Sequence, residues 1–495
     1  GHTRPLCVLG ARLTAEASDI VITILTTPNW LARARLEIAA QFSSGHEALE
    51  RIRIVSVFQS DAIQVREVVP LLTRFYPAVY QTVFRGDPIT CVTGATFGAL
   101  PSPTAIIMDF FASAQLHQTR AISGAAVPVF AFASCGAAAL VRLFAPESLG
   151  GLGDFGARTD AEALRTGKSS AEIGDQIFKY TDGSVIHVAG IPPMYDYEFF
   201  PQDVQLATSQ LPSPFILLAP MFMQSDGIFV GTCTAYENEA LTALNRWVTL
   251  TLHKPLYAVG PLLPPAYGSA GASSSEAPHG LEIKTFLDAA LAQHGQNSTL
   301  LVSFGTLFWP TVPQYLDELV DALTEKKFPF ILCHASPFAT ISPALRDKIN
   351  ASGVGMITRW SPQQYILTHP ATGWFMTHCG HGGVSEALSN GVPLICWPFE
   401  GDQPAAAANL AQTLDAAFHL LEVRTGQGLR PLFGGQVPQG TRAAVGAEFR
   451  RIADACRGAE GERKRANARK VALGFSQAWK EGGTARAAVR AFLER

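Results

Sequence analysis

The 495-residue sequence lacks a strong charge of either sign and has few charged residues in total. Asp, Glu, Lys and Arg make up 16% of the chain, the formal net charge is −3, and hydrophobic residues make up 47%. This balance gives no sign of a nucleic-acid partner or of binding to an anionic membrane surface. The apolar content predicts a compact chain, and the length suffices for two or more domains.

The sequence also lacks close cysteine pairs and long uninterrupted apolar runs. Its eight cysteines are scattered, which favours a reducing compartment, here the cytoplasm, over a disulfide scaffold or a zinc site. The longest weakly polar stretch, Ser123 to Ala145, is interrupted by Pro128 and by Cys135-Gly136. A buried strand followed by a helix explains this stretch better than a membrane span, so we expect no integral membrane segment.

An apolar strand is missing ahead of the first residues, Gly1-His2. We therefore expect that a segment upstream has been lost or left out, and a targeting segment there stays open.

Short β-branched or aromatic runs alternate with longer amphipathic stretches in two successive series. This alternation predicts an α/β fold of two doubly wound, Rossmann-like domains that face each other across a cleft at the carboxyl ends of their strands. The predicted strands are Ile20–Leu25, Ile52–Val57, Ala105–Asp109, Val127–Phe132 and Gly227–Val230, then Thr299–Phe304, Phe328–Leu332, Gly355–Thr358, Gly373–Thr377 and Pro393–Trp397.

A proline-containing segment, Val259 to Pro265, separates the two series and is followed by a stretch rich in Ser, Gly and Ala up to Gly280. Prolines stiffen a chain and small polar residues loosen it, so we predict an interdomain linker here, at residues 263–280.

The segment from Trp360 to Gln403 carries most of the chemistry. The strand Gly373–Thr377 leads into His378-Cys379-Gly380, further glycines and a helix predicted to begin near Val384. Free amides and the helix dipole at such a turn favour a phosphate. Glu386, in the helix's expected first turn, can accept hydrogen bonds from a ribose diol.

Groups suited to the two ends of a nucleotide sugar lie at the two ends of this segment. Glu400, Asp402 and Gln403 follow the next strand and can hold a hydroxylated ring, while Trp360 offers a flat face to a base.

This segment resembles the donor-binding signature of the family 1 UDP-dependent glycosyltransferases, which have the two-domain GT-B fold. WxPQ, HxxxxxFxxHCG, Glu386, GVP and the final Asp402-Gln403 fall in register with that signature. The resemblance implies that Trp360 stacks on uracil and that Gln363 lies beside the base and ribose. The UDP-sugar is then a co-substrate, and no cofactor is expected.

The resemblance also assigns the rest of the donor site. His378 contacts the diphosphate, Glu386 takes the ribose hydroxyls, and Asp402 and Gln403 hold the transferred sugar. A final Gln is usually associated with glucose rather than galactose. The full predicted donor set is Ser303, Gly305, Thr306, Trp360, Ser361, Gln363, His378, Gly380, Gly382, Gly383, Glu386, Glu400, Asp402 and Gln403, with no metal ligand.

The sequence departs from the plant pattern directly after His-Cys-Gly. Plant members have Trp-Asn-Ser at that point, whereas this chain has His381-Gly382-Gly383. Backbone amides must therefore replace the missing Asn and Ser side chains, and the sugar preference depends on this difference.

Weaker similarities to the family cover most of the chain. Leu300–Thr306 resembles its phosphate-facing strand and loop, Gly227–Glu239 resembles a strand and helix start late in its first domain, and Val259–Leu262 resembles the entry to its linker. Glu481–Ala485 resembles the terminal helix that crosses back. The implied division is an acceptor-binding domain at 1–262, the linker at 263–280, a UDP-sugar domain at 281–470 and a returning helix at 471–495.

The opening Gly-His-Thr-Arg-Pro resembles the family's Gly-His-x-x-Pro, whose histidine is the general base. An imidazole with a pKa near neutrality suits removal of the proton from an attacking hydroxyl. Asp109, which ends the predicted strand Ala105–Asp109, supplies the carboxylate that orients His2. The implied reaction is a single in-line displacement that inverts the anomeric carbon, giving a β-O-glycoside of a small lipophilic acceptor.

Other interpretations stay open on the residues alone. A sterol or glycolipid acceptor keeps the same fold, and a UDP-sugar binder without catalysis keeps the donor site. The glycines of Gly380–Gly383 imitate a dinucleotide fingerprint and allow a dehydrogenase. His378, Cys379 and His381 could suggest a metal, but no second cluster completes four ligands. We expect a monomer.

Overall fold

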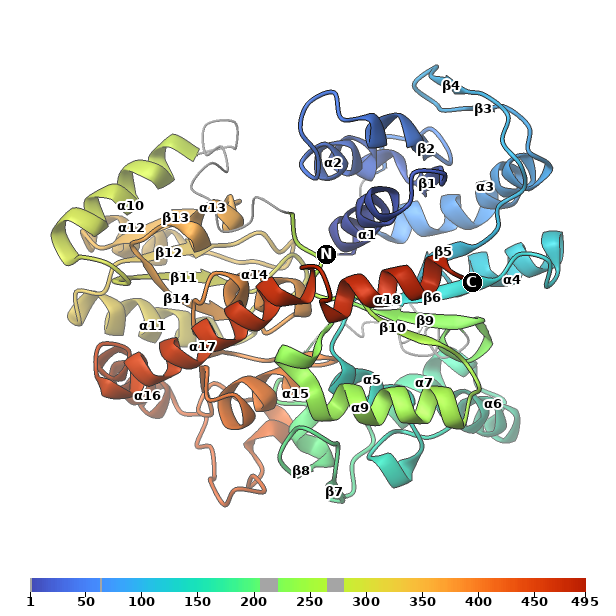
Figure 1. Ribbon diagram of the computed structural model, residues 1–495. Coiled ribbons are helices and arrows are strands. Elements are labelled where there is room, and N and C mark those ends of the chain that lie inside the picture. The colour runs from blue at the N-terminus through green and yellow to red at the C-terminus, as the bar shows by residue number, and fades with distance from the viewer. Residues whose placement is uncertain (1, 63–64, 205–220, 265–279) are drawn as a thin grey trace.

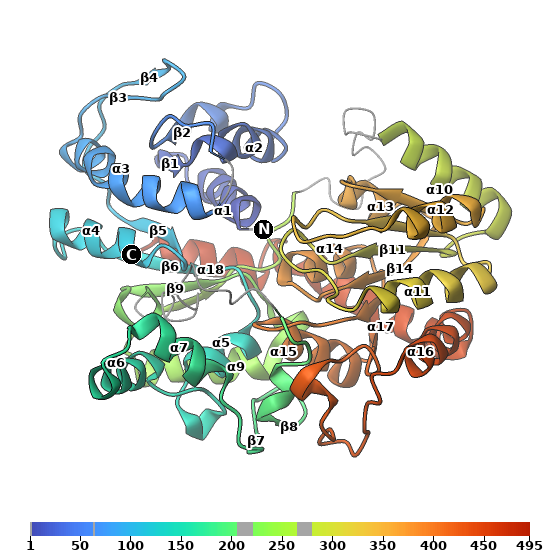
Figure 2. The same cartoon turned by 180° about the vertical axis from the view of Figure 1, so that it is seen from behind.

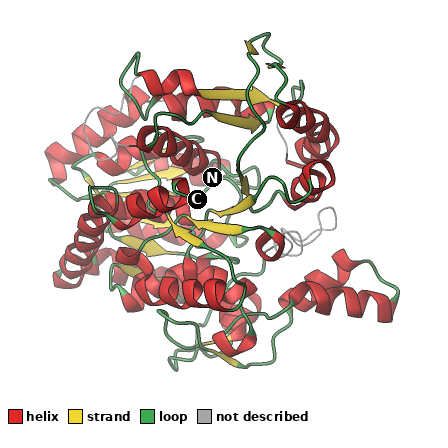
Figure 3. Cartoon of the chain, turned by 45° about the vertical axis from the view of Figure 1, so that its right-hand side comes forward, coloured by secondary structure: helices red, strands yellow, loops and turns green. Residues whose placement is uncertain are grey.

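The computed structural model describes residues 2–62, 65–204, 221–264 and 280–495. It consists of two α/β halves that lie side by side, the N-terminal half up to residue 264 and the C-terminal half from Gly280 onward (Figure 1). Most of the predicted linker, residues 265–279, lies outside the described residues. Helices cover the strands in both halves (Figure 3).

The C-terminal half contains one parallel six-stranded sheet in the order β13-β12-β11-β14-β15-β16. Its strands β11, β12, β14 and β15 are buried along their whole length, as expected for a parallel sheet with helices on both faces. The strand order reverses between β11 and β14, and in such sheets ligands bind outside the carboxyl ends of the strands at that point. The strands are β11 Thr299–Ser303, β12 Phe330–Cys333, β13 Gly355–Thr358, β14 Thr372–Thr377, β15 Leu394–Cys396 and β16 Ala417–His419.

The sheet of the N-terminal half is in two pieces. Four parallel strands pair in the order β10-β9-β6-β5, and a separate parallel pair joins β1 to β2. The predicted α/β fold class with parallel sheets is confirmed, with the parallel strands of this half divided between two sheets. The residues from Thr3 onward form helix α1, so the described chain places no strand between β1 and β5. The strands are β1 Ile22–Thr26, β2 Ile52–Ser56, β5 Ile106–Asp109, β6 Val129–Ala133, β9 Gly227–Val230 and β10 Leu256–Ala258. Two short antiparallel pairs are also present: β3 Ile89–Thr90 pairs with β4 Thr96–Phe97, and β7 Val185–Ile186 pairs with β8 Met194–Tyr195.

The α-helices connect and cover these strands. In the N-terminal half they are α1 Thr3–Glu16, α2 Pro28–Ala39, α3 Val65–Arg85, α4 Ser113–Ser123, α5 Ala137–Phe144, α6 Phe155–Thr166, α7 Ser170–Lys179 and α9 Thr234–Leu250. In the C-terminal half they are α10 Gly280–His294, α11 Pro313–Glu325, α12 Pro343–Ala351, α13 Gln363–Thr368, α14 His381–Ser389, α15 Gln403–Ala408, α16 Arg442–Ala455, α17 Ala459–Ala478 and α18 Thr484–Leu493.

All ten strands predicted from the sequence are present, with ends shifted by at most two residues. The prediction missed β10 and β16, which have three residues each, and the two-residue strands β3, β4, β7 and β8. Between Leu149 and Pro193 the structure has α6, α7 and strand β7 of a short hairpin.

The last two helices carry the chain back to the N-terminal half. Helix α18 packs against β10 and α1, and Figures 1 and 2 show it beside the N-terminal sheet. The indole Nε1 of Trp479 donates to the carbonyl of Pro261 (2.7 Å), and Arg490 and Arg486 both pair with Glu16. These contacts fix the two halves relative to each other at one end.

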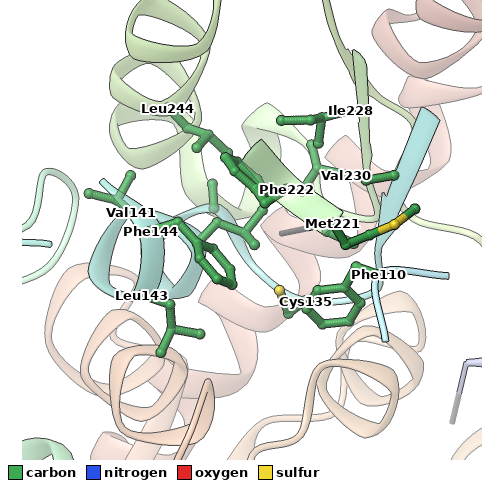
Figure 4. Close-up of a cluster of buried hydrophobic side chains, with 14 of the residues drawn as sticks. Phe110, Cys135, Val141, Leu143, Phe144, Met221, Phe222, Ile228, Val230 and Leu244 are labelled. Atoms are coloured by element: carbon green, nitrogen blue, oxygen red, sulfur yellow. The ribbon is translucent and has the colours of Figure 1, made fainter. Parts of the chain in front are cut away.

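The apolar core of the N-terminal half continues into the other half. Helix α5 is buried on every side, and Phe144 stacks on Phe222 (Figure 4). Ala405 and Ala408 of α15, which belongs to the C-terminal half, lie in the same cluster. Among the described residues no helix is long and apolar enough to cross a bilayer.

A buried carboxylate, that of Glu237, ties α9 to α5. Its oxygens accept hydrogen bonds from the backbone amides of Ala137 (2.8 Å) and Ala138 (3.2 Å) and from the hydroxyl of Thr232 (2.8 Å). The first turn of α5 thus obtains its acceptor from a residue about a hundred positions later in the chain.

Replacing Glu237 by Ala is expected to lower the free energy of unfolding by about 2–4 kcal/mol, because buried donors are left without an acceptor. Urea denaturation followed by circular dichroism measures the change. Glu239→Ala, at an exposed position on the same helix, is the matched control. Equal stability of the two variants would show that Glu237 does not cap α5.

Candidate functional site

The predicted donor residues converge at the carboxyl ends of β11, β14 and β15, where the sheet order reverses. Ser303 ends β11 and is buried, and its hydroxyl accepts from the amide of Gly305 (3.4 Å). Thr306 follows in an exposed position. His378 lies directly after β14, so these two loops are adjacent.

Two glycines enclose the ring of His378. A Cβ atom at Gly305, whose φ is +73°, would lie 2.7 Å from the His378 ring, and one at Gly380 would lie 2.5 Å from its Nε2. Burial lowers the pKa of His378 to about 4, so the imidazole is neutral at pH 7. A neutral imidazole in this position can donate one N–H to a phosphate without adding a full charge.

Helix α14 begins at His381, three residues earlier than predicted. The expected start near Val384 was wrong because two successive glycines were read as part of the turn, whereas Gly382 and Gly383 lie within the first helical turn. Glu386 therefore lies in the second turn, not the first. A Cβ at Gly382 would meet nothing within 4 Å, so this position of the first turn has open space beside it.

Glu386 is 5% exposed and is held by two neighbours. Its Oε2 accepts from Nε2 of Gln363 (2.5 Å), and its Oε1 accepts from Nη1 of Arg4, which comes from the other half of the chain. Ser361, two residues before Gln363, is buried, whereas Trp360 is 49% exposed.

The residues predicted to hold the sugar lie around the loop between β15 and α15. Burial raises the pKa of Asp402, while the His381 ring, the backbone amides of Asp402 and His381, and His2 lower it. Burial also raises the pKa of Glu400, and Lys179 of α7 counteracts this shift. Gln403 is buried, and its Oε1 accepts from the amide of Phe399 (2.9 Å).

The structure brings His2 and Asp109 together. Nδ1 of His2 lies 2.8 Å from Oδ2 of Asp109, at the end of β5, and Oδ1 of Asp109 accepts from the amide of Phe111 (3.0 Å). With Nδ1–H donating to the carboxylate, Nε2 is the basic nitrogen. His2 is also close enough to Asp402, one of the residues predicted to hold the sugar, to lower the pKa of that carboxyl.

Three features of the site were not predicted. The rings of Phe110 (5.7 Å between centroids) and Phe111 (5.1 Å) pack against the ring of His2, although their position directly after Asp109 was a usable signal. Arg4 reaches Glu386 across the two halves, and Nε2 of His381 bonds to the carbonyl of Gly231 (2.9 Å). We call this contact region, with Arg4, Gly231, His381 and Glu386, the junction.

Comparisons with known proteins agree with this geometry. The family model described as UDP-glucoronosyl and UDP-glucosyl transferase matches residues 233–427. The UDP-glycosyltransferase eriJ of Hericium erinaceus is 30% identical, over all of this chain and 96% of that protein. The anthocyanidin 3-O-glucosyltransferase of Zea mays is 25% identical, over all of this chain and 94% of that protein.

A solved structure shows the same fold. The crystal structure of Medicago truncatula UGT71G1 complexed with UDP-glucose has a TM-score of 0.68 and 17% sequence identity, covering all of this chain and 96% of that one.

His378→Asn is expected to weaken the dependence of stability on pH. Because the pKa of His378 in the folded chain lies below that of an unfolded histidine, the unfolded state gains protons first as the pH falls, and stability is lost between about pH 6.5 and pH 4. Thermal unfolding at about pH 7 and about pH 5 should therefore differ less in the variant. A residual difference is expected from His419, whose pKa burial lowers to about 3. An unchanged difference in the variant would contradict the neutral state of His378.

Proposed function

The chain belongs to the family 1 UDP-glycosyltransferases, enzymes of the GT-B fold that transfer a sugar from a UDP-sugar to a small-molecule acceptor, and we propose that it transfers glucose with inversion to a hydroxyl of a lipophilic acceptor. The product is then a β-O-glucoside. Membership of this family sets aside the dehydrogenase that the glycines of Gly380–Gly383 allowed.

The observation that carries the proposal is the hydrogen bond between His2 and Asp109, beside Asp402. In the proposed reaction Nε2 of His2 removes the proton of the acceptor hydroxyl while the oxygen attacks the anomeric carbon. Asp109 holds the ring and stabilises the imidazolium that forms. An intact pair of this kind argues against a binder without catalysis.

The leaving UDP carries the negative charge that develops in the transition state. We propose that the N-terminus of α14, with the amides of Gly382 and Gly383, and a neutral N–H of His378 stabilise this charge. Backbone amides then make the phosphate contacts that Asn and Ser side chains make in the plant signature. On this account no metal or other cofactor is needed besides the UDP-sugar itself.

Glucose as the sugar is supported by Gln403, the last residue of the donor signature. A relative acting as a glucosyltransferase and a solved structure of the same fold with UDP-glucose agree with it. His381, in place of the plant Trp, lies beside Asp402 and is the residue of this chain most able to alter that preference.

A lipophilic acceptor is supported by the apolar surroundings of His2. Phe110 and Phe111 pack against its ring, and Figure 4 shows Phe110 close to Cys135 and Met221. Cys135 is buried in the same apolar cluster as Phe110 and Met221. The eight cysteines are all buried and unpaired, which supports our further proposal of a reducing, cytoplasmic location.

Incubation with UDP-glucose and a panel of phenols, sterols and other hydroxylated lipids tests the proposal. We expect UDP release that depends on an acceptor, together with a product heavier by one hexose. His2→Ala should lower the rate about 10³-fold and Asp109→Asn about 10²-fold, because each impairs proton removal in the transition state. Coupled UDP detection and mass spectrometry measure both.

The affinity for UDP serves as the control, since neither substitution alters the phosphate or ribose contacts. Full activity of His2→Ala would show that His2 is not the catalytic base. Activity with a different UDP-sugar but not with UDP-glucose would show that the transferred sugar is not glucose. If a sterol is the preferred acceptor, the protein is a sterol glycosyltransferase, and the chemistry of the transfer is the same.

Metal removal gives an independent test of the leaving-group assignment. With EDTA in excess, the initial rate is expected to stay within about twofold of the untreated rate, because helix amides and His378 replace a cation. A rate that collapses with EDTA and returns with added Mg²⁺ or Mn²⁺ would contradict this account.

A further inference from the structure

Arg4 links three elements from both halves of the chain. It lies in the first turn of α1, and its Nε donates to Oε1 of Glu37 on α2 (2.9 Å). Its Nη1 donates to Oε1 of Glu386 on α14, 382 positions later. The side-chain oxygen of Gln364 on α13, with its amide oriented to satisfy both groups, accepts from the same Nη1 at 2.8 Å.

The guanidinium is fixed from the N-terminal side. Glu37 is only 5% exposed and accepts from Arg4 and also from Arg33 of its own helix (2.5 Å). Arg33 is far more exposed than Arg4 and has no contact with Glu386 among the described residues. Arg4 is therefore the cation that connects the buried carboxylate of α2 to the buried carboxylate of α14.

Glu386 has capacity left for a ligand. A carboxylate offers about four acceptor positions, two on each oxygen. Arg4 uses one on Oε1 and Gln363 uses one on Oε2, so each oxygen keeps one acceptor position. A ribose diol brings two neutral donors and no charge, so the buried carboxylate still needs a cation when the diol is bound.

We infer that Arg4 is a positioning residue of the donor site: it orients and neutralises Glu386, so that both carboxylate oxygens face the ribose hydroxyls of UDP. The inference rests on the proposed donor site and adds to it a residue from the opposite half of the chain. Because His2 lies two residues before Arg4, the same contact fixes the start of α1, and with it the base, relative to the bound nucleotide.

The test compares the binding of UDP and of 2′-deoxy-UDP to the full chain by isothermal titration calorimetry. The unaltered protein is expected to prefer UDP, because the deoxy nucleotide lacks one hydroxyl for Glu386. Arg4→Met should weaken UDP binding about tenfold and bring the ratio of the two dissociation constants close to one. In turnover, the KM for UDP-glucose should rise by a similar factor, while kcat changes less.

Three further variants make the outcome specific. Arg33→Met removes the other cation on Glu37 and should leave both dissociation constants unchanged. Glu37→Gln frees Arg4 without deleting it and should reduce the preference for UDP in the same direction, which keeps the inference testable if Arg4→Met does not fold. Arg4→Lys restores the charge but not the fork of donors, so it should recover part of the affinity.

Two results would overturn the inference. One is an unchanged preference for UDP in Arg4→Met and Glu37→Gln. The other is tighter UDP binding in Arg4→Met, which would mean that Arg4 competes with the ribose for Glu386. Absence of UDP binding in the unaltered protein would instead overturn the proposed function, and the inference with it.

Discussion

The pairing of two buried carboxylates, Glu37 and Glu386, with Arg4 is the constraint on which the rest of the structure depends. Glu37 and Glu386 are nearly inaccessible, and a carboxylate removed from water is costly unless it is paired. Arg4 serves both of them, and it comes from one half while Glu386 comes from the other. The same ion pairs therefore hold the two halves together and orient Glu386, the residue that we propose to bind the ribose.

The carboxylate of the proposed catalytic pair, that of Asp109, is also held in place by its partners. Both oxygens of Asp109 have a partner, the imidazole of His2 and the amide of Phe111, so the carboxylate has one orientation. The rings of Phe110 and Phe111, which also contact each other, pack against the imidazole and restrict its orientation. A base held in this way needs little rearrangement before the reaction.

The sequence predicted the strands well, because they depend on local patterns, and the predicted donor residues are likewise drawn from a local pattern. The apolar runs of β11 and β14, and the spacing between Trp360 and Gln403, can be read without knowing the fold. Contacts between distant segments could not be predicted. His381 and Gly231 are 150 positions apart, and Arg4 and Glu386 are 382 apart, so no periodicity connects them. The start of α14 was missed for a different reason, since glycine disfavours helices in general but is compatible with a first turn.

The enclosure of His378 by Gly305 and Gly380 has an evolutionary consequence. Any side chain at either glycine would occupy the space of the imidazole, and Gly305 also has a backbone conformation that other residues adopt only with strain. A larger residue is therefore tolerated only if His378 becomes smaller at the same time, which removes the group that we propose to face the diphosphate. Because these three positions can change only together, we expect them to change more slowly over time than positions on the protein surface.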